Sequence, residues 1–348
     1  MIVSKSEIHA FFKRCQAEGL GGFQQVIVPR RSMVQPRDLF FTALNDKVEM
    51  VLESYRTVDP LRALFYFPRE RILGGDVPKV KRLVVGAKAC DLRGLQVLDK
   101  ALINAEFVDP CYAAWRRNTT IVTVDCAEIG VSCHCNLVGG KPYAEEGFDL
   151  NLTALDVDYY HLSVGSAKGE ELLALIQSAT TITKASPEEK RLVSENRQAA
   201  VRKLQIQNAG LERGENYERL KKADIRIWIE EAQTCCGCGG CTNICPTCYC
   251  IILNDETTGK EFIKDKSWDS CQVNGYARVA GGATPRPKMF ERFRNRYLCK
   301  FVNMPANFGL LGCTGCGRCI DVCAGKIKFT EVIKNVMEAK QVQETEHV

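Results

Sequence analysis

The most constraining feature of this 348-residue chain is a dense group of cysteines. Seven of its 19 cysteines lie between Cys235 and Cys250, in the run C-C-G-C-G-G-C-T-N-I-C-P-T-C-Y-C. Core packing does not need thiols at this density, whereas soft metals bind them. Cys238 and Cys241 continue from Cys235 with the spacing C-x2-C-x2-C, and Cys245 follows after three further residues and precedes a proline. This is the spacing of bacterial two-cluster 4Fe-4S proteins, in which the fourth cysteine binds the other cluster.

A second run with the same C-x2-C-x2-C-x3-C spacing is therefore required, and the chain contains one: Cys313, Cys316, Cys319 and Cys323. Crossed ligation predicts one 4Fe-4S cluster on Cys235, Cys238, Cys241 and Cys323, and a second on Cys313, Cys316, Cys319 and Cys245. Glycines separate the ligands of both runs, where the backbone must curl tightly around a cluster. A zinc ribbon is the alternative, but it needs four ligands per ion and leaves the third cysteine of each run unexplained.

Composition narrows the class of protein. The length suggests about two domains, and 45% apolar with 26% charged residues is typical of a globular chain. Residues 1–15 contain no apolar segment of a signal peptide, so we expect reduced thiols and a cytoplasmic protein rather than a secreted disulfide scaffold. No run of about 18 apolar residues predicts a membrane span. The net charge of +5 favours neither nucleic acid nor membrane, and anionic clusters would offset it.

Residues 1–183 have the pattern of an α/β domain. Short apolar runs at 25–28 and 64–67, each followed by proline, predict strands. A buried strand at 82–88 leads into a helix for which Asp91 is the expected N-cap. The next strand, 120–124, would lie parallel to it, which brings both carboxyl ends to the sheet edge where α/β proteins bind ligands.

Four cysteines are predicted to meet at that edge: Cys90, Cys126, Cys133 and Cys135. The first two follow the two strands, and the others lie in the next loop. We expect a third iron-sulfur cluster there, with a structural zinc ion or merely buried thiols as alternatives. His134 lies inside the C-x-C pair, where its ring either ligates metal or, as we expect, faces solvent.

Residues 184–233 are predicted to form a helical connector. Ser186-Pro187-Glu188-Glu189 is a capping box that opens a helix to about Gln207. A glycine-containing break at 208–216 and a helix carrying Trp228 follow. A solvated, charge-rich spacer is compatible with the same pattern. The remaining segment, 234–348, is expected to be a two-cluster ferredoxin-like α+β domain with a long insert, a closing helix at 330–339 and a polar tail.

The insert between the two runs carries two further patterns. Cysteines outside the ferredoxin spacing form a candidate for a further iron-sulfur or zinc site: Cys248, Cys250, Cys271 and Cys299. Basic residues alternate with aromatic ones between Arg286 and Lys300. Such a stretch suits RNA binding, but it also suits a helix packed against anionic clusters. We favour the second interpretation because the whole chain lacks a strongly basic balance.

Several motifs occur together in one order along the chain. They are Ala89-Cys90-Asp91-Leu92, Asp109-Pro110, Arg116-Arg117, Asp125-Cys126, Cys133-His134-Cys135, the block from Cys235 to Cys250, Trp268-Asp269-Ser270-Cys271, Ala280-Gly281-Gly282, Arg286 and Cys313-Thr314-Gly315-Cys316-Gly317-Arg318-Cys319. With these motifs the chain resembles, over most of its length, the family shared by the iron-sulfur beta subunits of soluble nickel-iron hydrogenases (sulfhydrogenases) and the corresponding iron-sulfur subunit of anaerobic sulfite reductase. It departs from that pattern at Ala324, where proline is usual, at His134, where an aromatic residue is usual, and at Cys299, where histidine is common.

The resemblance implies an electron-transfer subunit of a larger anaerobic oxidoreductase complex. Its partners would be a flavoprotein subunit that carries FAD and reacts with NAD(P)H, and a catalytic subunit: a hydrogenase, a sulfite or sulfur reductase, or a heterodisulfide-reductase-like unit. No dinucleotide or phosphate-binding loop and no nucleophile with a positioned base occurs in the sequence, so no catalytic residue is predicted. Two alternatives stay open. One is a reductase of a sulfur compound acting at Cys90 to Cys135, and the other is an iron-sulfur or zinc scaffold that binds nucleic acid.

Overall fold

The computed structural model describes residues 1–73, 77–211 and 217–339. The part of the chain before Pro187 is organised around a mixed sheet of eight strands in the order β3-β2-β5-β6-β7-β8-β1-β9. The strands are β1 (Ile2–Ser4), β2 (Gln25–Arg31), β3 (Leu39–Ala43), β5 (Arg82–Ala87), β6 (Thr119–Val124), β7 (Leu150–Ala154), β8 (Tyr159–Val164) and β9 (Ile182–Thr183). Strands β2, β5, β6 and β7 run parallel, and the outer strands pair antiparallel.

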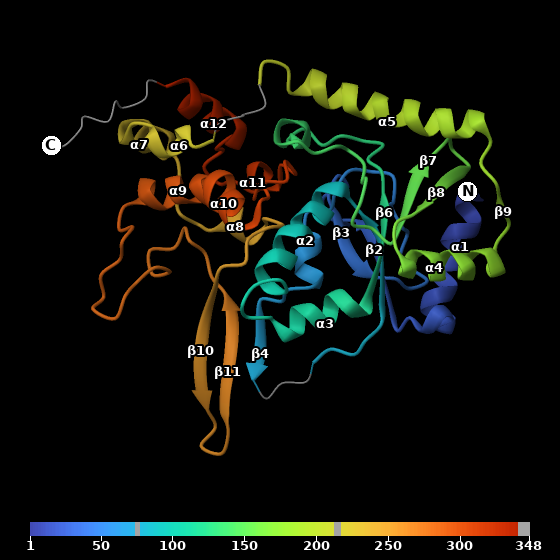
Figure 1. Ribbon diagram of the computed structural model, residues 1–348, viewed down its shortest axis with the longest axis horizontal. Coiled ribbons are helices and arrows are strands. Elements are labelled where there is room, and N and C mark those ends of the chain that lie inside the picture. Colours follow the sequence, from blue (N-terminus) through green and yellow to red (C-terminus); the bar gives the residue numbers. More distant parts are fainter. Residues whose placement is uncertain (74–76, 212–216, 340–348) are drawn as a thin grey trace.

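Helices cover both faces of this sheet (Figure 1). They are α1 (Lys5–Glu18), α2 (Ala89–Leu102), α3 (Pro110–Asn118) and α4 (Ala167–Ala179). Leu83 and Val85 of β5 pack in the core with α1 and α4, and Val84 between them packs with α2 and α3. A strand that is covered on both faces is apolar at most positions, which explains the apolar run from Leu83 to Ala87 in β5.

Two local predictions in this part were wrong. Residues 64–67 do not form a strand: a 3-10 helix, Leu61–Leu64, precedes a turn, and strand β4 (Arg69–Leu73) begins after Pro68. Phe65 and Tyr66 are fully buried beneath α2, so their apolar character reflects packing of a turn. Helix α2 begins at Ala89, and Asp91 therefore lies in its first turn instead of at its N-cap. The strand predicted at 25–28 does form but continues past Pro29.

The segment after the sheet is helical, as predicted. It comprises α5 (Pro187–Gln207), α6 (Arg219–Lys222) and α7 (Ile225–Glu231). Ser186 and Glu189 form the predicted capping box of α5. This helix is not a solvated spacer, because Asn196 donates to the carbonyl oxygens of Ala154 and Leu155, at 3.0 and 3.1 Å. Helix α5 consequently lies across the carboxyl edge of the parallel strands (Figure 1).

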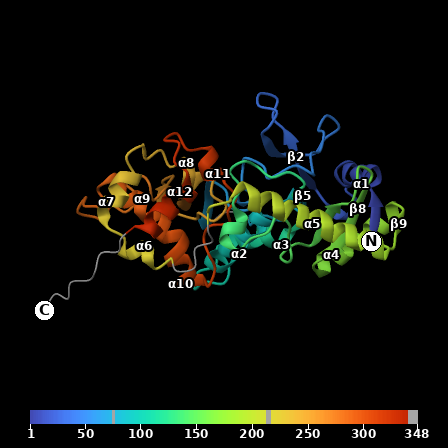
Figure 2. The ribbon, with the colours of Figure 1, turned by 90° about the horizontal axis from the view of Figure 1, so that it is seen from above.

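The C-terminal part contains short helices around an aromatic core. The helices are α8 (Gly240–Asn243), α9 (Met289–Leu298), α10 (Met304–Phe308), α11 (Arg318–Asp321) and α12 (Phe329–Glu338), with a π-helical turn at Cys299–Asn303. Trp228, Phe293, Tyr297, Phe301 and Phe329 form the centre of this core. Seen from above, these helices lie beside the sheet and its helices (Figure 2). The predicted polar tail after Ala339 and residues 212–216 of the predicted break lie outside the described residues.

A hairpin in the insert joins the two parts of the chain. Its strands are β10 (Ile251–Thr257) and β11 (Phe262–Trp268), and β11 pairs antiparallel with β4. The resulting three-stranded sheet extends away from the rest of the molecule (Figure 1). The residue pattern of the insert did not indicate this hairpin. The pairing means that β4, from the N-terminal half, completes a sheet that belongs to the C-terminal half.

Candidate metal centres

The first of three cysteine-lined cavities lies next to α8. Four thiols that crossed ligation assigns to one cluster line it: Cys235, Cys238, Cys241 and Cys323. Gly237 and Gly239 have φ angles of 66° and 73°, in the left-handed region that side chains rarely adopt. Helix α8 begins directly after Gly239. The side chains of Cys236 and Cys238 are exposed, so this cavity lies at the surface of the chain.

The second cavity has the same construction around the other run. Its thiols are Cys245, Cys313, Cys316 and Cys319. Gly315 and Gly317 repeat the left-handed geometry of the first run, with φ angles of 67° and 74°, and α11 begins directly after Gly317. The second cavity takes three cysteines from one run and one from the other, whereas the first is lined by two cysteines of the second run, Cys319 and Cys323. Both cavities thus combine cysteines of the two runs, and the crossed assignment and the binding of iron stay predictions.

The third cavity lies at the carboxyl edge of the sheet. Cys90 from the start of α2, Cys126 after β6, and Cys133 and Cys135 from the following loop all line it. The strand, helix and strand predicted from the sequence thus bring the quartet together. Gly315 and Cys316 of the second run form part of the same wall. The third cavity is therefore separated from the second by the residues of a single loop.

His134 is buried, and the expectation that its ring faces solvent was wrong. The residue is 2% exposed. Its Nδ1 atom lies 2.9 Å from the Ser132 carbonyl oxygen, and its Nε2 atom lies 3.9 Å from the Cys313 sulfur. Burial lowers the pKa of His134, so the ring is neutral at neutral pH. The ring forms part of the wall of the second cavity.

Two glycines explain why this loop can lie so close to the second run. A Cβ atom on Gly315 would lie 2.3 Å from the Cys135 Cα atom, and one on Gly317 would lie 2.3 Å from the Ser132 carbonyl oxygen. The His134 amide donates to the Gly315 carbonyl at 2.8 Å. Any side chain at either glycine would push the second and third cavities apart. The sequence signal for this contact is the spacing C-x-G-C-G between the ligands, although it does not reveal the partner loop.

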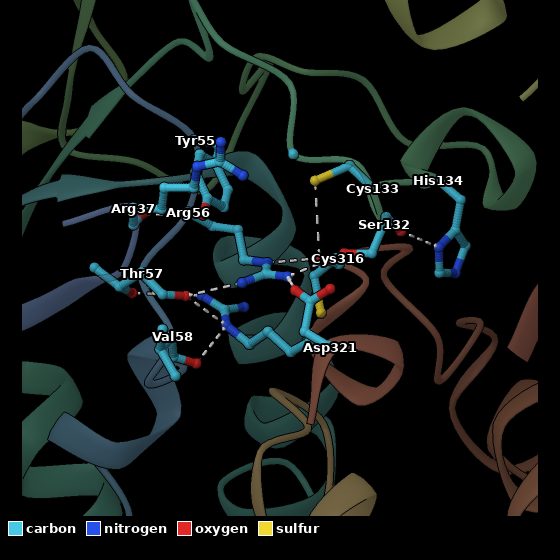
Figure 3. A network of polar contacts seen from close by, with 12 residues as sticks. Arg37, Tyr55, Arg56, Thr57, Val58, Ser132, Cys133, His134, Cys316 and Asp321 are labelled. Carbon is cyan, nitrogen blue, oxygen red and sulfur yellow. Dashed lines mark hydrogen bonds and ion pairs between the residues drawn. The ribbon is translucent and has the colours of Figure 1, made fainter. Parts of the chain in front are cut away.

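The three cavities lie in series. Cys319 and Arg296 line both the first and the second cavity, and Cys316 lines both the second and the third. Arg56, which lies outside the cysteine motifs, lines the third cavity and contacts the second cysteine run (Figure 3). Its Nε atom donates to the Cys316 carbonyl at 2.6 Å, and its guanidinium forms an ion pair with Asp321. Nothing in the sequence around Arg56 marked it as part of a site.

Buried cations surround the thiols. Arg292, Arg296 and Lys300, from the basic stretch of the insert, are 8%, 7% and 2% exposed. Burial lowers the pKa of Lys300, but the thiolate forms of Cys245 and Cys248 outweigh it and raise the pKa above its ordinary value. Arg296 and Lys300 line the cavities, whereas Arg292 donates to the backbone carbonyl oxygens of residues in the insert. The inward orientation fits packing against anionic clusters and leaves these three side chains unable to contact RNA.

The candidate fourth site is not assembled as one group. Cys248 hydrogen-bonds to Cys245, whereas Cys250 hydrogen-bonds to Cys271 and Tyr276. Cys299 lies within electrostatic range of Cys271. Within the described residues, in this group and in the three cavities alike, no three or more His, Cys, Asp or Glu side chains converge on a point that could hold one metal ion. Cys248 lies within electrostatic range of Cys250, and a metal site on these four cysteines stays a prediction.

The residues of the three cavities fit iron-sulfur clusters. Six cysteines line the first cavity, four the second and five the third, and each set includes the four that are assigned to one cluster. Burial raises the pKa of Cys126 to about 12 and that of Cys319 to about 11. Because the thiolate is the form that binds metal, cluster binding must displace these protons.

Comparison with known proteins agrees with this geometry. Residues 234–327 match the 4Fe-4S dicluster domain family, which defines the chain as an iron-sulfur protein of the electron-transfer class. Over 315 residues, 86% of this chain and 89% of the relative, it is 32% identical to sulfhydrogenase 2 subunit beta from Pyrococcus furiosus. The chain belongs to the family of iron-sulfur beta subunits of hydrogenases that the sequence motifs indicated. No helix in the described ranges is long and apolar enough to cross a membrane.

Proposed function

We propose that this chain relays electrons between a flavoprotein subunit that reacts with NAD(P)H and a separate catalytic subunit. The catalytic subunit would be a hydrogenase, a sulfite or sulfur reductase, or a heterodisulfide-reductase-like unit. The observation that carries the proposal is the series of three adjoining cavities, each lined by at least four cysteines. A chain that performed one reaction at one centre would not need three such sites in a row.

The protein's own residues set the conditions for such a relay. A bound 4Fe-4S cluster supplies one-electron transfer at a potential that depends on charge, hydrogen bonding and exposure. Lys300 and Arg296 place positive charge beside the second cavity, and Arg318 is buried near the thiols of Cys90 and Cys316. Positive charge stabilises the reduced state, which carries one more negative charge. These side chains therefore make the second and third sites easier to reduce than the same thiols without them.

The exposed end of the series is a suitable docking point for one partner. Cys236 and Cys238 are exposed at the first cavity, and Val322 nearby is 43% exposed. Partly exposed apolar groups around a redox centre are typical of a surface that another protein covers. We assign a partner redox subunit to this end, with no preference for the direction of electron flow.

Both alternatives from the sequence are less well supported. A chain that reduced a sulfur compound itself would need an iron with an open position, but five cysteines already border the third cavity. A nucleic-acid scaffold would need its basic stretch at the surface, whereas Arg292, Arg296 and Lys300 are buried. Electron transfer through bound clusters is consistent both with the cysteines around the third cavity and with the burial of these cations.

Reduction of the isolated chain tests the proposal. The chain is purified without oxygen, its iron content is verified, and its visible absorption is followed during addition of reductant. We expect bleaching with dithionite and none with NADH or NADPH until the flavoprotein is added. Rapid reduction by either nucleotide in the absence of flavin would show that the chain has a nicotinamide site of its own.

A further inference from the structure

A cavity of about 220 Å³ lies between helix α5 and the carboxyl edge of the sheet. Asp125 and Cys126, which follow β6, line it together with Thr153 of β7. Tyr143 from the neighbouring loop forms a wall. It has room for a small organic acid or an oxyanion.

The composition of α5 explains why this space is not filled. Asn196, Ala199, Ala200 and Lys203 all line the cavity, at positions i, i+3, i+4 and i+7 of one helix face. Two alanines thus lie where larger apolar side chains would be needed to pack the interior to ordinary density. Leu204, the next residue on this face, is fully buried and covers the third cavity instead. Helix α5 therefore roofs two adjoining cavities and fills only one of them.

Arg197 is held in place by groups around the cavity. Its Nε atom donates to Asp125 Oδ2 at 2.8 Å, and its Nη2 atom donates to Thr153 Oγ1 at 3.4 Å. The guanidinium carbon also lies 4.5 Å from the centre of the Tyr143 ring. Among the residues that the structure describes, none accepts a hydrogen bond from Arg197 Nη1. A rigid guanidinium with free N–H groups is suited to carboxylate and oxyanion recognition.

The charges around the cavity also favour an anion. Asp125 accepts hydrogen bonds from Asn151 at 3.1 Å and Thr153 at 2.7 Å, in addition to its ion pair with Arg197. The Asp125 carboxylate balances the charge of Arg197. Lys203 adds a second cation at the rim, and it has no ion-pair partner in the described parts of the chain. The lining therefore carries one net positive charge that its own residues leave uncompensated.

We propose that this cavity binds a small oxyanion or carboxylate through Arg197 and Lys203, in contact with the side chain of Cys126. Cys126 lines both this cavity and the third cysteine-lined cavity. An anion bound here opposes the addition of an electron to a cluster at Cys126, and linkage requires that reduction weakens anion binding by the same factor. The binding site stands on geometry alone, whereas its coupling to the third cluster rests on the proposed function.

Calorimetric titration of the anaerobically purified, iron-containing chain tests the binding. The probes are inorganic phosphate, sulfate and acetate at constant ionic strength, against a chloride background. We expect saturable binding of at least one probe, weakened about tenfold or more in Lys203→Gln and in Arg197→Gln, as for loss of a charge-assisted hydrogen bond. Arg202→Gln removes an exposed charge from the same helix without touching the cavity, and it should bind like the wild type.

A cavity-filling variant keeps the test decisive, because Arg197→Gln leaves Asp125 without its ion pair and can unfold the edge of the sheet. Ala199→Leu adds a large side chain to the cavity without removing a charge, and it should abolish binding while circular dichroism stays unchanged. Failure of all three probes to bind the wild type would overturn the proposal. Equal affinity in wild type, Lys203→Gln and Ala199→Leu would show that binding occurs elsewhere and would also overturn it.

The coupling has its own readout. Electron paramagnetic resonance (EPR) redox titrations with and without the bound probe should show one cluster signal whose midpoint potential falls with the probe, and no such shift in Ala199→Leu. Binding without any shift would overturn the contact with Cys126. An iron content near eight per chain, at four per cluster, would show that the third cluster of the proposed function is absent. Calorimetric binding in the same sample would still support the anion site. Iron near twelve with no binding would overturn this inference alone.

Discussion

The guanidinium of Arg318 lies 2.9 Å from the carboxylate of Asp91, and each side chain is 1% exposed. Asp91 follows Cys90 of the third cavity, and Arg318 precedes Cys319 of the second. The pair therefore joins the ligand loops of two neighbouring sites that come from opposite ends of the chain. Its charge also lies close to the thiols of both Cys90 and Cys316.

Removal of Arg318 should be strongly destabilising. Arg318→Met leaves the Asp91 carboxylate buried without its partner, which typically costs about 3–5 kcal/mol. Chemical denaturation of the variant and the wild type measures this loss. Arg226 and Asp224 form a surface pair in which the arginine is 85% exposed, so Arg226→Gln is the matched control and should leave stability unchanged. Similar stability of Arg318→Met and the wild type would contradict the role of the pair.

Iron content should distinguish two filled sites from three. The wild type is expected to contain about twelve irons per chain and Cys90→Ser about eight, since each cubane holds four. Cys15 is a fully buried thiol in the core between the sheet and α1, away from all three cavities. Cys15→Ala should therefore retain the wild-type content. A wild-type value near eight, unchanged in Cys90→Ser, would show that the third cavity holds no cluster.

Crossed ligation predicts that Cys245 binds the second cluster and not the first. Cys245→Ser should damage the cluster at Cys313, Cys316 and Cys319, and it should leave the signal of the first cluster intact in EPR spectra. Cys248→Ser is the control, because Cys248 contacts Cys245 but does not line the second cavity. Loss of the first cluster in Cys245→Ser would mean that each run binds its own cluster.

Lys300 should raise the midpoint potential of the second cluster. Its ammonium is buried beside Cys245 and donates to Thr247 Oγ1 at 2.7 Å. Lys300→Met removes a positive charge that stabilises the reduced state, so the potential should fall by on the order of 100 mV, from Coulomb's law with an effective dielectric constant of about 20. Lys300→Arg keeps the charge and should shift it far less. A potential that rises or stays constant in Lys300→Met would refute this assignment.

Gly315 should be intolerant of a side chain. Gly315→Ala places a methyl group 2.3 Å from the Cys135 Cα atom, whereas Gly309→Ala, at a similar positive φ of 70°, meets no atom within 4 Å. Both variants carry the cost of a left-handed residue, about 1–2 kcal/mol. Only Gly315→Ala should also lower the iron content towards about eight, because it separates the loop of Cys133 and Cys135 from the second run. Equal iron content in the two variants would argue against this close approach.

Which cysteines lie together could be predicted from the sequence, because the spacing of metal ligands is a local property of the chain. The runs beginning at Cys235 and Cys313 indicate crossed pairing by themselves. The grouping of Cys90, Cys126, Cys133 and Cys135 could be predicted because two parallel strands place their carboxyl ends at one edge of the sheet. Both inferences depend on short segments whose geometry is set within a few residues.

The features that the sequence did not reveal depend on contacts between distant segments. The burial of His134 results from its loop lying on Gly315 and Gly317, which nothing near His134 encodes. The apolar run at 64–67 looks the same whether it forms a strand or a buried turn, and only packing beneath α2 decides between them. The cavity under α5 exists because Ala199 and Ala200 are small, and alanines are common in any helix.

The sheet formed by β4, β10 and β11 has a consequence for biosynthesis. Arg69 of β4 hydrogen-bonds to Asp265 of β11, which is 196 residues later in the chain. As the chain leaves the ribosome, β4 has no partner until the hairpin has been made, and an unpaired strand edge promotes association with other chains. A fragment covering 234–348 would likewise expose the free edge of β11. The polypeptide must therefore be made at least as far as Trp268 before the edge of β4 can be covered.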